Sequence, residues 1–401
     1  MSAFLVGHAT HPDWRAALAL AAAQIGSRMA LHEAAAGAPL SLGFVYFSDH
    51  YAAHADALYA ALRRQWPGVA WVGSVGVGVS AGGAEYIDEP ALALMLAALP
   101  VGHFEVFSGA RKLQRIEPFS ALVHADPATP DLAELIEEMS ERTASGYLFG
   151  GLASSRGDTT HLAEGVWRGG LSGVAFTQDV ALVSRVTQGC QPLGPVHVVT
   201  ACDRNLVTAL DGRPALLTLL AELGIADLDD PHQALPKLRA TLAGLTDATD
   251  NALVRGGQFG ADTRVRHLVG LDPARQAVAL AGVVEPGMRL AFCQRDVQAA
   301  RRDLVRICSE IRDEVESQAE AALPAGVPAP ASAARRILGA LYISCSGRGG
   351  PHFGGPSAEL KIVQHALGDV PLVGFFAAGE IARHHLYGYT GVLTVFTGSL
   401  G

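Results

Sequence analysis

Hydrophobic residues of this chain occur in short continuous runs that alternate with stretches of helical spacing, a pattern typical of α/β proteins. An apolar run at 42–47 is followed by helical spacing at 55–65 and by a second apolar run at 69–72. Buried parallel strands form continuous apolar runs, whereas a connecting helix repeats its apolar residues every three or four positions. The order and the lengths therefore predict a strand–helix–strand unit with parallel strands.

The same order of strand, helix and strand recurs further along the chain. Near the C-terminus it covers 337–344, 357–367 and 371–374, and a looser middle copy lies within 121–151. Internal repetition of this kind predicts two pseudo-symmetric α/β lobes with internal strand–helix–strand repeats.

Glycines follow the second strand of each copy at matching positions. Gly73 and Gly78 in the first copy correspond to Gly374 and Gly379 in the C-terminal copy. Open α/β sheets bind ligands beyond the carboxyl ends of their parallel strands. The loops that follow these strands are therefore the candidate ligand-binding segments.

The composition restricts the class of protein. Of the 401 residues, 49% are hydrophobic and 17% are charged, which predicts a large core and excludes intrinsic disorder. No run of about 18 apolar residues occurs, and no basic residue precedes the apolar run at the N-terminus. We expect a soluble, cytoplasmic protein without a membrane span or a secretory signal.

Charge and cysteine usage exclude two further classes. The net charge is −9 and the basic residues are scattered, so the chain lacks the electrostatic surface of a nucleic-acid-binding protein. Its five cysteines are odd in number and form no CxxC pair. This argues against a disulfide framework and against a structural zinc site.

The segment 345–350 directly follows a predicted strand and carries candidate ligand-binding residues. Gly347 and Gly349 would expose backbone N–H groups, and Arg348 has the planar guanidinium that binds a carboxylate or a phosphate with two hydrogen bonds. Cys345 has two alternative interpretations. It is either a reactive thiol whose pKa is lowered by cationic neighbours, or an inert buried side chain.

A second loop combines several polar side chains within eleven residues. Gly379 and Glu380 begin it, and a carboxylate after a glycine turn is suited to binding the amine of a ligand. His384, His385 and Tyr387 follow, and either histidine has the chemistry of a metal or haem-iron ligand. The alternative is an ordered loop whose polar groups satisfy one another.

Common catalytic motifs are absent from the sequence. There is no G-x-S-x-G turn, no H-E-x-x-H and no recognisable Ser-His-Asp order. We therefore predict that the protein is not an enzyme, with thiol chemistry at Cys345 as the enzymatic alternative.

Several of these segments together resemble FIST domains. The resembling segments are 44–48, 72–78, 188–194, 210–215, 345–349 and 371–381. They span nearly the whole chain, and the resemblance implies a FIST N-terminal domain at 1–185 and a FIST C-terminal domain at 186–401. One departure concerns Val79, which occupies the place that Glu380 has in the C-terminal copy. This difference argues against a symmetric arrangement of two ligands.

The resemblance implies a bacterial sensory protein that binds a small ligand, with amino acids proposed as ligands for the family. Arg348 would bind the carboxylate of such a ligand and Glu380 its ammonium group. Because no transmitter domain is attached, the signal would pass to a separate partner such as a histidine kinase or a cyclic-dinucleotide enzyme.

Two alternative functions are compatible with the sequence. Some stand-alone FIST proteins of similar length are haem proteins that sense nitric oxide, so a haem-based sensor would use His384 or His385 as the axial ligand. A thiol enzyme or redox switch at Cys345 is the other alternative.

Overall fold

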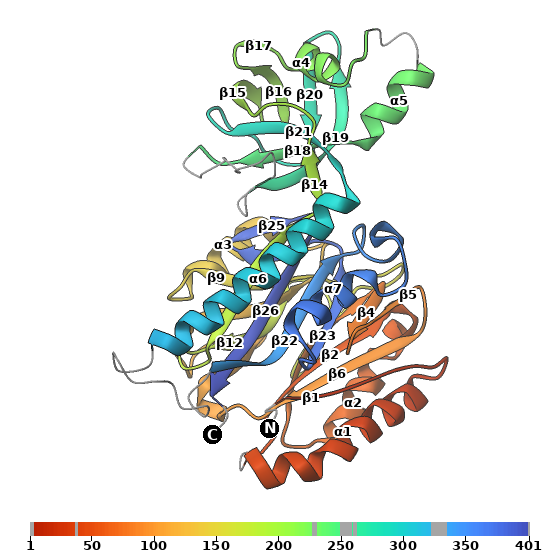
Figure 1. Cartoon of the computed structure of the whole chain (residues 1–401), viewed down its shortest axis with the longest axis vertical. Helices are drawn as coiled ribbons and strands as arrows, with labels where there is room; N and C mark the ends of the chain where they lie inside the picture. The colour runs from red at the N-terminus through yellow and green to blue at the C-terminus, as the bar shows by residue number, and fades with distance from the viewer. Residues whose placement is uncertain are drawn as a thin grey trace. The chain divides into compact units, whose positions relative to one another are not determined.

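The computed structural model describes residues 4–36, 39–226, 231–248, 259, 263–321 and 335–399 (Figure 1). The chain forms two compact units. Unit 1 comprises Met1–Thr187 and Leu304–Gly401, and unit 2 comprises Gln188–Asp303. Unit 1 is therefore discontinuous in sequence, because the whole of unit 2 is inserted between its two parts.

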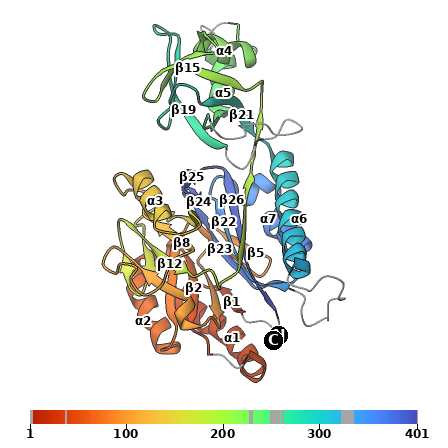
Figure 2. The ribbon, with the colours of Figure 1, turned by 90° about the vertical axis from the view of Figure 1, so that its left-hand side faces the viewer.

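The first sheet of unit 1 has the strand order β1-β6-β2-β3-β10-β11. Its strands are β1 (Phe4–Thr10), β2 (Leu42–Ser48), β3 (Ala70–Gly76), β6 (Ala91–Ala97), β10 (His161–Ala163) and β11 (Val166–Trp167). β2 and β3 are parallel and are connected through α2 (Ala55–Gln65), whereas β6 is antiparallel to β1 and β2. α2 and α1 (Trp14–Ala36) lie against one face of this sheet (Figure 2). Their apolar side chains form a core with that face.

The second sheet has the order β25-β24-β9-β8-β12-β7 and repeats this arrangement. Its strands are β7 (Phe104–Phe107), β8 (Ser120–Ala125), β9 (Tyr147–Leu152), β12 (Leu171–Phe176), β24 (Glu380–Arg383) and β25 (His385–Tyr387). β8 and β9 are parallel and are connected through α3 (Leu132–Glu141). β12 is antiparallel to β8 and to β7.

The third sheet has the order β13-β26-β22-β23-β4-β5. Its strands are β4 (Gly78–Ala81), β5 (Ala84–Ile87), β13 (Leu182–Gln188), β22 (Arg335–Cys345), β23 (Leu372–Ala377) and β26 (Thr390–Ser399). β22 and β23 are parallel and are connected through α7 (Ala358–Leu367), and β26 is antiparallel to β22. The long helix α6 (Val297–Ala321) precedes β22 in the chain.

The three repeats exchange hairpins in a cycle. The hairpin β4–β5 follows β3 in the chain but pairs with β23 of the third sheet. The hairpin β10–β11 follows β9 but pairs with β3, and the hairpin β24–β25 follows β23 but pairs with β9. The second parallel strand of each repeat thus obtains its outer neighbour from a different repeat.

A glycine occupies the same register position in each parallel pair. A Cβ atom on Gly73, Gly150 or Gly374 would lie 1.7, 1.9 or 1.7 Å, respectively, from the carbonyl oxygen of the paired residue on the neighbouring strand. No side chain fits at such a distance, so the close approach of these strands requires glycine.

One face of each sheet contributes to a central apolar core. Tyr46 of the first sheet stacks on Phe375 of the third, with ring centroids 5.0 Å apart. Phe396 of the third sheet contacts Phe176 of the second edge to face, and Phe149 of the second sheet stacks on Phe176. Burial of these rings supplies much of the hydrophobic stabilisation of unit 1.

Unit 2 is an antiparallel sheet with the order β14-β21-β15-β16-β20-β19-β18, in which β21 also pairs with β18. Its elements are β14 (Cys190–Pro192), β15 (His197–Asp203), β16 (Leu206–Leu210), β17 (Arg213–Pro214), α4 (Ala215–Glu222), α5 (Pro231–Ala240), β18 (Thr241–Thr246), β19 (Arg264–Asp272), β20 (Ala277–Leu280) and β21 (Arg289–Arg295). The additional pairing closes the sheet into a barrel. Apolar side chains of α4 join the core of this barrel.

The α/β class predicted from the sequence is confirmed, and so are the strand–helix–strand copies. The predicted helices 55–65 and 357–367 coincide with α2 and, within one residue, with α7. All copies lie in unit 1. The predicted domains, 1–185 and 186–401, stay a prediction. Across the described residues, no helix has both the length and the apolar character needed to cross a membrane.

We predict that Gly73→Ala destabilises the protein by at least about 2 kcal/mol, because the new methyl group forces β2 and β3 apart. Urea unfolding followed by circular dichroism measures this change. Gly26→Ala is the matched control, since Gly26 lies in the exposed part of α1 with no atom within 4 Å of the added carbon. The control is expected to stabilise the protein by roughly 0.5–1 kcal/mol. Equal effects of the two substitutions would contradict the prediction.

Candidate functional site

The two predicted ligand-binding loops lie side by side in unit 1. β22 and β23 are parallel, and Cys345 at the end of β22 pairs in register with Ala377 at the end of β23. The backbone N–H of Ser346 donates a hydrogen bond to the carbonyl of Ala377 at 2.8 Å. The segments 345–349 and 379–380 therefore leave the same edge of the third sheet, as the sequence predicts.

Arg348 is buried and makes its hydrogen bonds within the protein. Its exposed fraction is 1%. Nε donates to Glu359 Oε1 at 2.7 Å, and the two terminal nitrogens donate to the side chain and the backbone carbonyl of Thr187 at 3.1 and 3.4 Å. The guanidinium also lies over the ring of Phe353, 5.1 Å from its centroid. A ligand carboxylate can reach Arg348 only by replacing one of these partners.

Glu359, in the first turn of α7, is the centre of this polar cluster. Besides Arg348, it accepts hydrogen bonds from the hydroxyl of Tyr342 at 2.6 Å and from Ser344 Oγ at 3.0 Å. Tyr342 and Ser344 point to the same face of β22 because they are two residues apart. A buried ion pair is tolerated when its remaining hydrogen-bonding capacity is satisfied, as it is here.

Glu380 lies close to this ion pair and is fully buried. Its Oε2 accepts hydrogen bonds from the backbone N–H and the hydroxyl of Thr390, at 3.2 and 2.7 Å. Within the described part of the chain, its Oε1 has no hydrogen-bond partner. Burial raises the pKa of Glu380 to about 8, although Thr390 and the charge of Arg348 oppose the shift. The carboxyl group therefore holds a proton at neutral pH.

Cys345 lies beside Glu380, and its thiol is also buried. Burial, followed by the nearby carboxyl of Glu380, raises its pKa to about 12. The neutral thiol is thus the dominant form at physiological pH, which favours the interpretation of Cys345 as an inert side chain.

The other predicted residues surround these groups. Tyr387 is buried and pairs directly with Glu380 across the β24–β25 hairpin. Gly349 packs against Phe376, whose ring would be 2.1 Å from an added Cβ atom. Gly379 precedes Glu380 at the start of the exchanged hairpin.

The exchanged hairpins place three different residues at one equivalent position. Val79, His161 and Glu380 each pair with the residue that follows the close-approach glycine of the neighbouring strand. The predicted correspondence between Val79 and Glu380 is therefore confirmed, and His161 is its third member. Burial lowers the pKa of His161, whose ring nitrogens contact Ser172 Oγ and the carbonyl of Gly169.

A cavity of about 620 Å³ lies next to the glycine-rich loop. It is lined by Glu85, Ile87, Asp88, Glu89, Gly350, Gly354, Gly355, Pro356 and Ser357. Glu85 connects this cavity to the polar cluster, because its Oε1 accepts a hydrogen bond at 2.8 Å from the backbone N–H of Leu360, the residue after Glu359. Burial raises the pKa of Glu85 to about 7, and the negative charge of Glu359 adds to the shift. The sequence did not single out Glu85, since it stands in a short hairpin far from α7 in the chain.

His384 and His385 do not fit a buried haem. They lie at the turn of the β24–β25 hairpin, where His384 is exposed and His385 is half-buried. The centroids of their rings are 3.9 Å apart, and the ring planes are tilted by 52°. A haem needs an apolar slot into which an axial imidazole points, and neither histidine lines the cavity beside the glycine-rich loop. Among the residues described, no group of three or more His, Cys, Asp and Glu side chains is arranged to hold a metal ion.

Comparisons with known proteins agree with this architecture. The family model described as the FIST N domain matches residues 41–213, and the model of the FIST C domain matches residues 217–383. An uncharacterized protein of Mycobacterium tuberculosis is 34% identical over 409 residues, and an uncharacterized protein of Mycobacterium bovis is 32% identical over 410 residues. Each alignment covers 98% of this chain and 98% of the relative.

We predict that Glu380→Gln changes the pH dependence of stability. The pKa of this carboxyl is about 8 in the native protein and about 4.5 without the protein environment. The favourable contribution of the protonated Glu380 to the free energy of unfolding is therefore complete below about pH 4.5. It is lost as the pH rises towards 8, by at most about 1.4 kcal/mol per pH unit. The free energy of unfolding of the wild type, relative to the variant, is expected to fall between pH 5 and pH 8.5 in urea titrations. Glu138→Gln, an exposed control, should show no such trend, and a constant difference for Glu380→Gln would refute the prediction.

Proposed function

We propose that this chain, which belongs to the FIST family, is a non-enzymatic sensor that binds an amino-acid-like ligand and signals through a separate partner protein. FIST domains are sensory domains that bind small ligands in signal transduction. The observation that carries the proposal is the connection, through Glu85 and α7, between the 620 Å³ cavity and the buried cluster of Arg348, Glu359 and Glu380.

The proposed ligand contacts are those predicted from the sequence. Arg348 binds the carboxylate. Glu380 loses its proton when the ammonium group lies beside it, because a nearby cation favours the ionised carboxylate, and it then binds that group. The backbone of Gly347, Gly349 and Gly379 and the side chains of Cys345 and Tyr387 surround the ligand. Because Arg348 already binds Glu359 and Thr187, the ligand must take the place of one of them.

Such an exchange of partners converts binding into a conformational change. Glu359 belongs to the first turn of α7, and Thr187 is the last residue of unit 1 before the chain enters unit 2. A ligand that releases Glu359 or Thr187 from Arg348 allows the segment that carries the released residue to change position. The ligand favours this released conformation to the extent that it binds it more tightly than the unreleased one. A histidine kinase or a cyclic-dinucleotide enzyme is the proposed recipient of this signal.

Neither alternative function gains support from the site. The surroundings of His384 and His385 do not fit a haem, and the raised pKa of Cys345 leaves little thiolate for catalysis.

A thermal-shift screen with free L-amino acids tests the proposal, because a ligand that binds the native state raises the melting temperature. We expect at least one amino acid to do so, and calorimetry should show at least about tenfold weaker binding to Arg348→Lys and Glu380→Gln. Arg142→Lys, an exposed arginine in a surface ion pair, is the control and should bind normally. The proposal is wrong if no amino acid raises the melting temperature, or if both site variants, folded by circular dichroism, bind like the wild type.

We also predict slow alkylation of Cys345. Iodoacetamide at pH 7.5, followed by peptide mass spectrometry, should modify the half-buried Cys202 before Cys345, because the pKa of Cys345 is about 12 and its side chain is buried. Preferential labelling of Cys345 would instead support the thiol enzyme or redox switch.

A further inference from the structure

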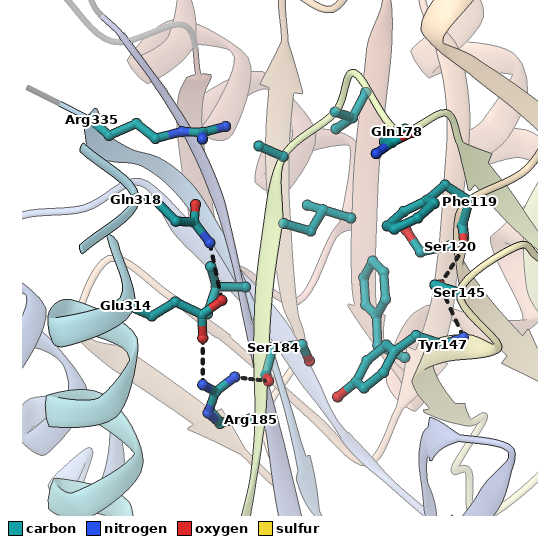
Figure 3. Close-up of a pocket in the computed structure, with 15 residues that line it drawn as sticks. Phe119, Ser120, Ser145, Tyr147, Gln178, Ser184, Arg185, Glu314, Gln318 and Arg335 are labelled. Atoms are coloured by element: carbon teal, nitrogen blue, oxygen red, sulfur yellow. Dashed lines mark hydrogen bonds and ion pairs between the residues drawn. The ribbon is translucent and has the colours of Figure 1, made fainter. Parts of the chain in front are cut away.

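A second cavity of unit 1 shares no residue with the site described above. Its volume is about 470 Å³, within the range of small-molecule sites (Figure 3). It is lined by Phe119, Ser120, Ser145, Tyr147, Phe149, Gln178, Val180, Ala181, Leu182, Val183, Ser184, Arg185, Glu314, Gln318 and Arg335. We propose that this cavity binds a small amphipathic carboxylate, with an apolar or aromatic body and one negative charge.

One wall of the cavity is aromatic and aliphatic. Phe149 and Val180 are buried members of the central core, and Tyr147 and Leu182 pack against that core from the cavity side. Figure 3 shows Phe119 and Tyr147 on this wall, across the cavity from Arg335 and Gln318. Burial raises the pKa of Tyr147, so its side chain stays an uncharged phenol. This wall suits an aromatic or aliphatic group.

The opposite wall is charged, but most of its charges neutralise one another. Arg185 donates to Glu310 Oε2 at 3.2 Å and to the carbonyl of Ser184 at 2.9 Å, and it also binds Glu314. Gln318 Nε2 donates to Glu314 Oε1 at 3.0 Å. These bonds hold the wall in place and leave no carboxylate there without a partner.

Arg335 differs from the other charged residues of this cavity. It is half-buried at the start of β22, and its side chain extends towards the cavity in Figure 3. Over the described ranges, no acidic side chain lies within ion-pair distance of its guanidinium, and no side-chain hydrogen bond holds it. A guanidinium at the edge of an apolar cavity is suited to a carboxylate, which it binds with two hydrogen bonds.

The combination of these walls decides the ligand class. A purely apolar molecule would leave the guanidinium of Arg335 without a partner, and a cation would be repelled by it. A monocarboxylate with an apolar body satisfies both walls at once. The neighbouring residue Arg336 lies on the opposite side of β22, because successive side chains of a strand alternate, and it is exposed. It therefore serves as a matched control.

Isothermal titration calorimetry of the full chain with 4-phenylbutyrate tests the proposal. We expect the wild type and Arg336→Gln to bind the probe equally, and Arg335→Gln to bind it at least about tenfold more weakly. The neutral analogue 4-phenylbutan-1-ol should bind the wild type and Arg335→Gln alike, because it lacks the carboxylate. Ala181 lines the cavity directly before β13, so the larger side chain of Ala181→Phe should fill the cavity and abolish binding of both compounds. Circular dichroism should show that this variant is folded.

The proposal is overturned if 4-phenylbutyrate does not bind the wild type, or if Arg335→Gln binds it as tightly as Arg336→Gln does. Equal binding by a folded Ala181→Phe variant would likewise place the probe elsewhere. Since Arg335 and Ala181 do not belong to the amino-acid site, these outcomes are independent of the thermal-shift screen.

Discussion

Unit 1 depends on the pairing of each exchanged hairpin with a strand of another repeat. β3, β9 and β23 would otherwise each present a row of unpaired backbone groups at a sheet edge. The exchange satisfies these groups and fixes the order of the three sheets around the central core. It also explains why Glu380, which follows the third repeat's strand, lies next to Gly151 of the second sheet.

The buried polar cluster of Arg348, Glu359 and their hydrogen-bond partners is a second constraint on the structure. It selects one packing arrangement of the elements around it and adds little to the stability of the fold. Arg348 and Glu359 are each 1% exposed, and removing both charges from water is expensive even when they are paired. The hydroxyls of Tyr342, Ser344 and Thr187 satisfy the pair and thereby fix one arrangement of α7 against β22. A site of this kind has a small number of discrete hydrogen-bonding arrangements, because a buried charged group that leaves one partner must bind another.

Local patterns in the sequence predicted the parts of the fold that local chemistry determines. The repeats and the helices α2 and α7 follow from the periodicity of apolar residues. The exchange of hairpins could not be predicted, since a short strand carries no local signal for which strand it will pair with. The sequence placed the two glycine-containing loops together, because each follows a strand of the same parallel pair. It did not identify Glu359 as the partner of Arg348, because a contact between side chains of separate segments also carries no local signal. The cavity around Arg335 is assembled from five separate segments, and none of them is distinctive alone.

The insertion of unit 2 into unit 1 determines how this chain can fold during synthesis. The first sheet and the strands β7, β8, β9 and β12 of the second sheet leave the ribosome long before β22, β23 and β26. Their inner faces and the outer edge of β9 therefore stay uncovered until the second part of unit 1, which begins at Leu304, has been synthesised. Unit 2 is continuous in sequence and can form its barrel during this interval. Exposed apolar faces and unpaired strand edges promote aggregation, so the nascent N-terminal part of this protein carries aggregation-prone surface until translation ends.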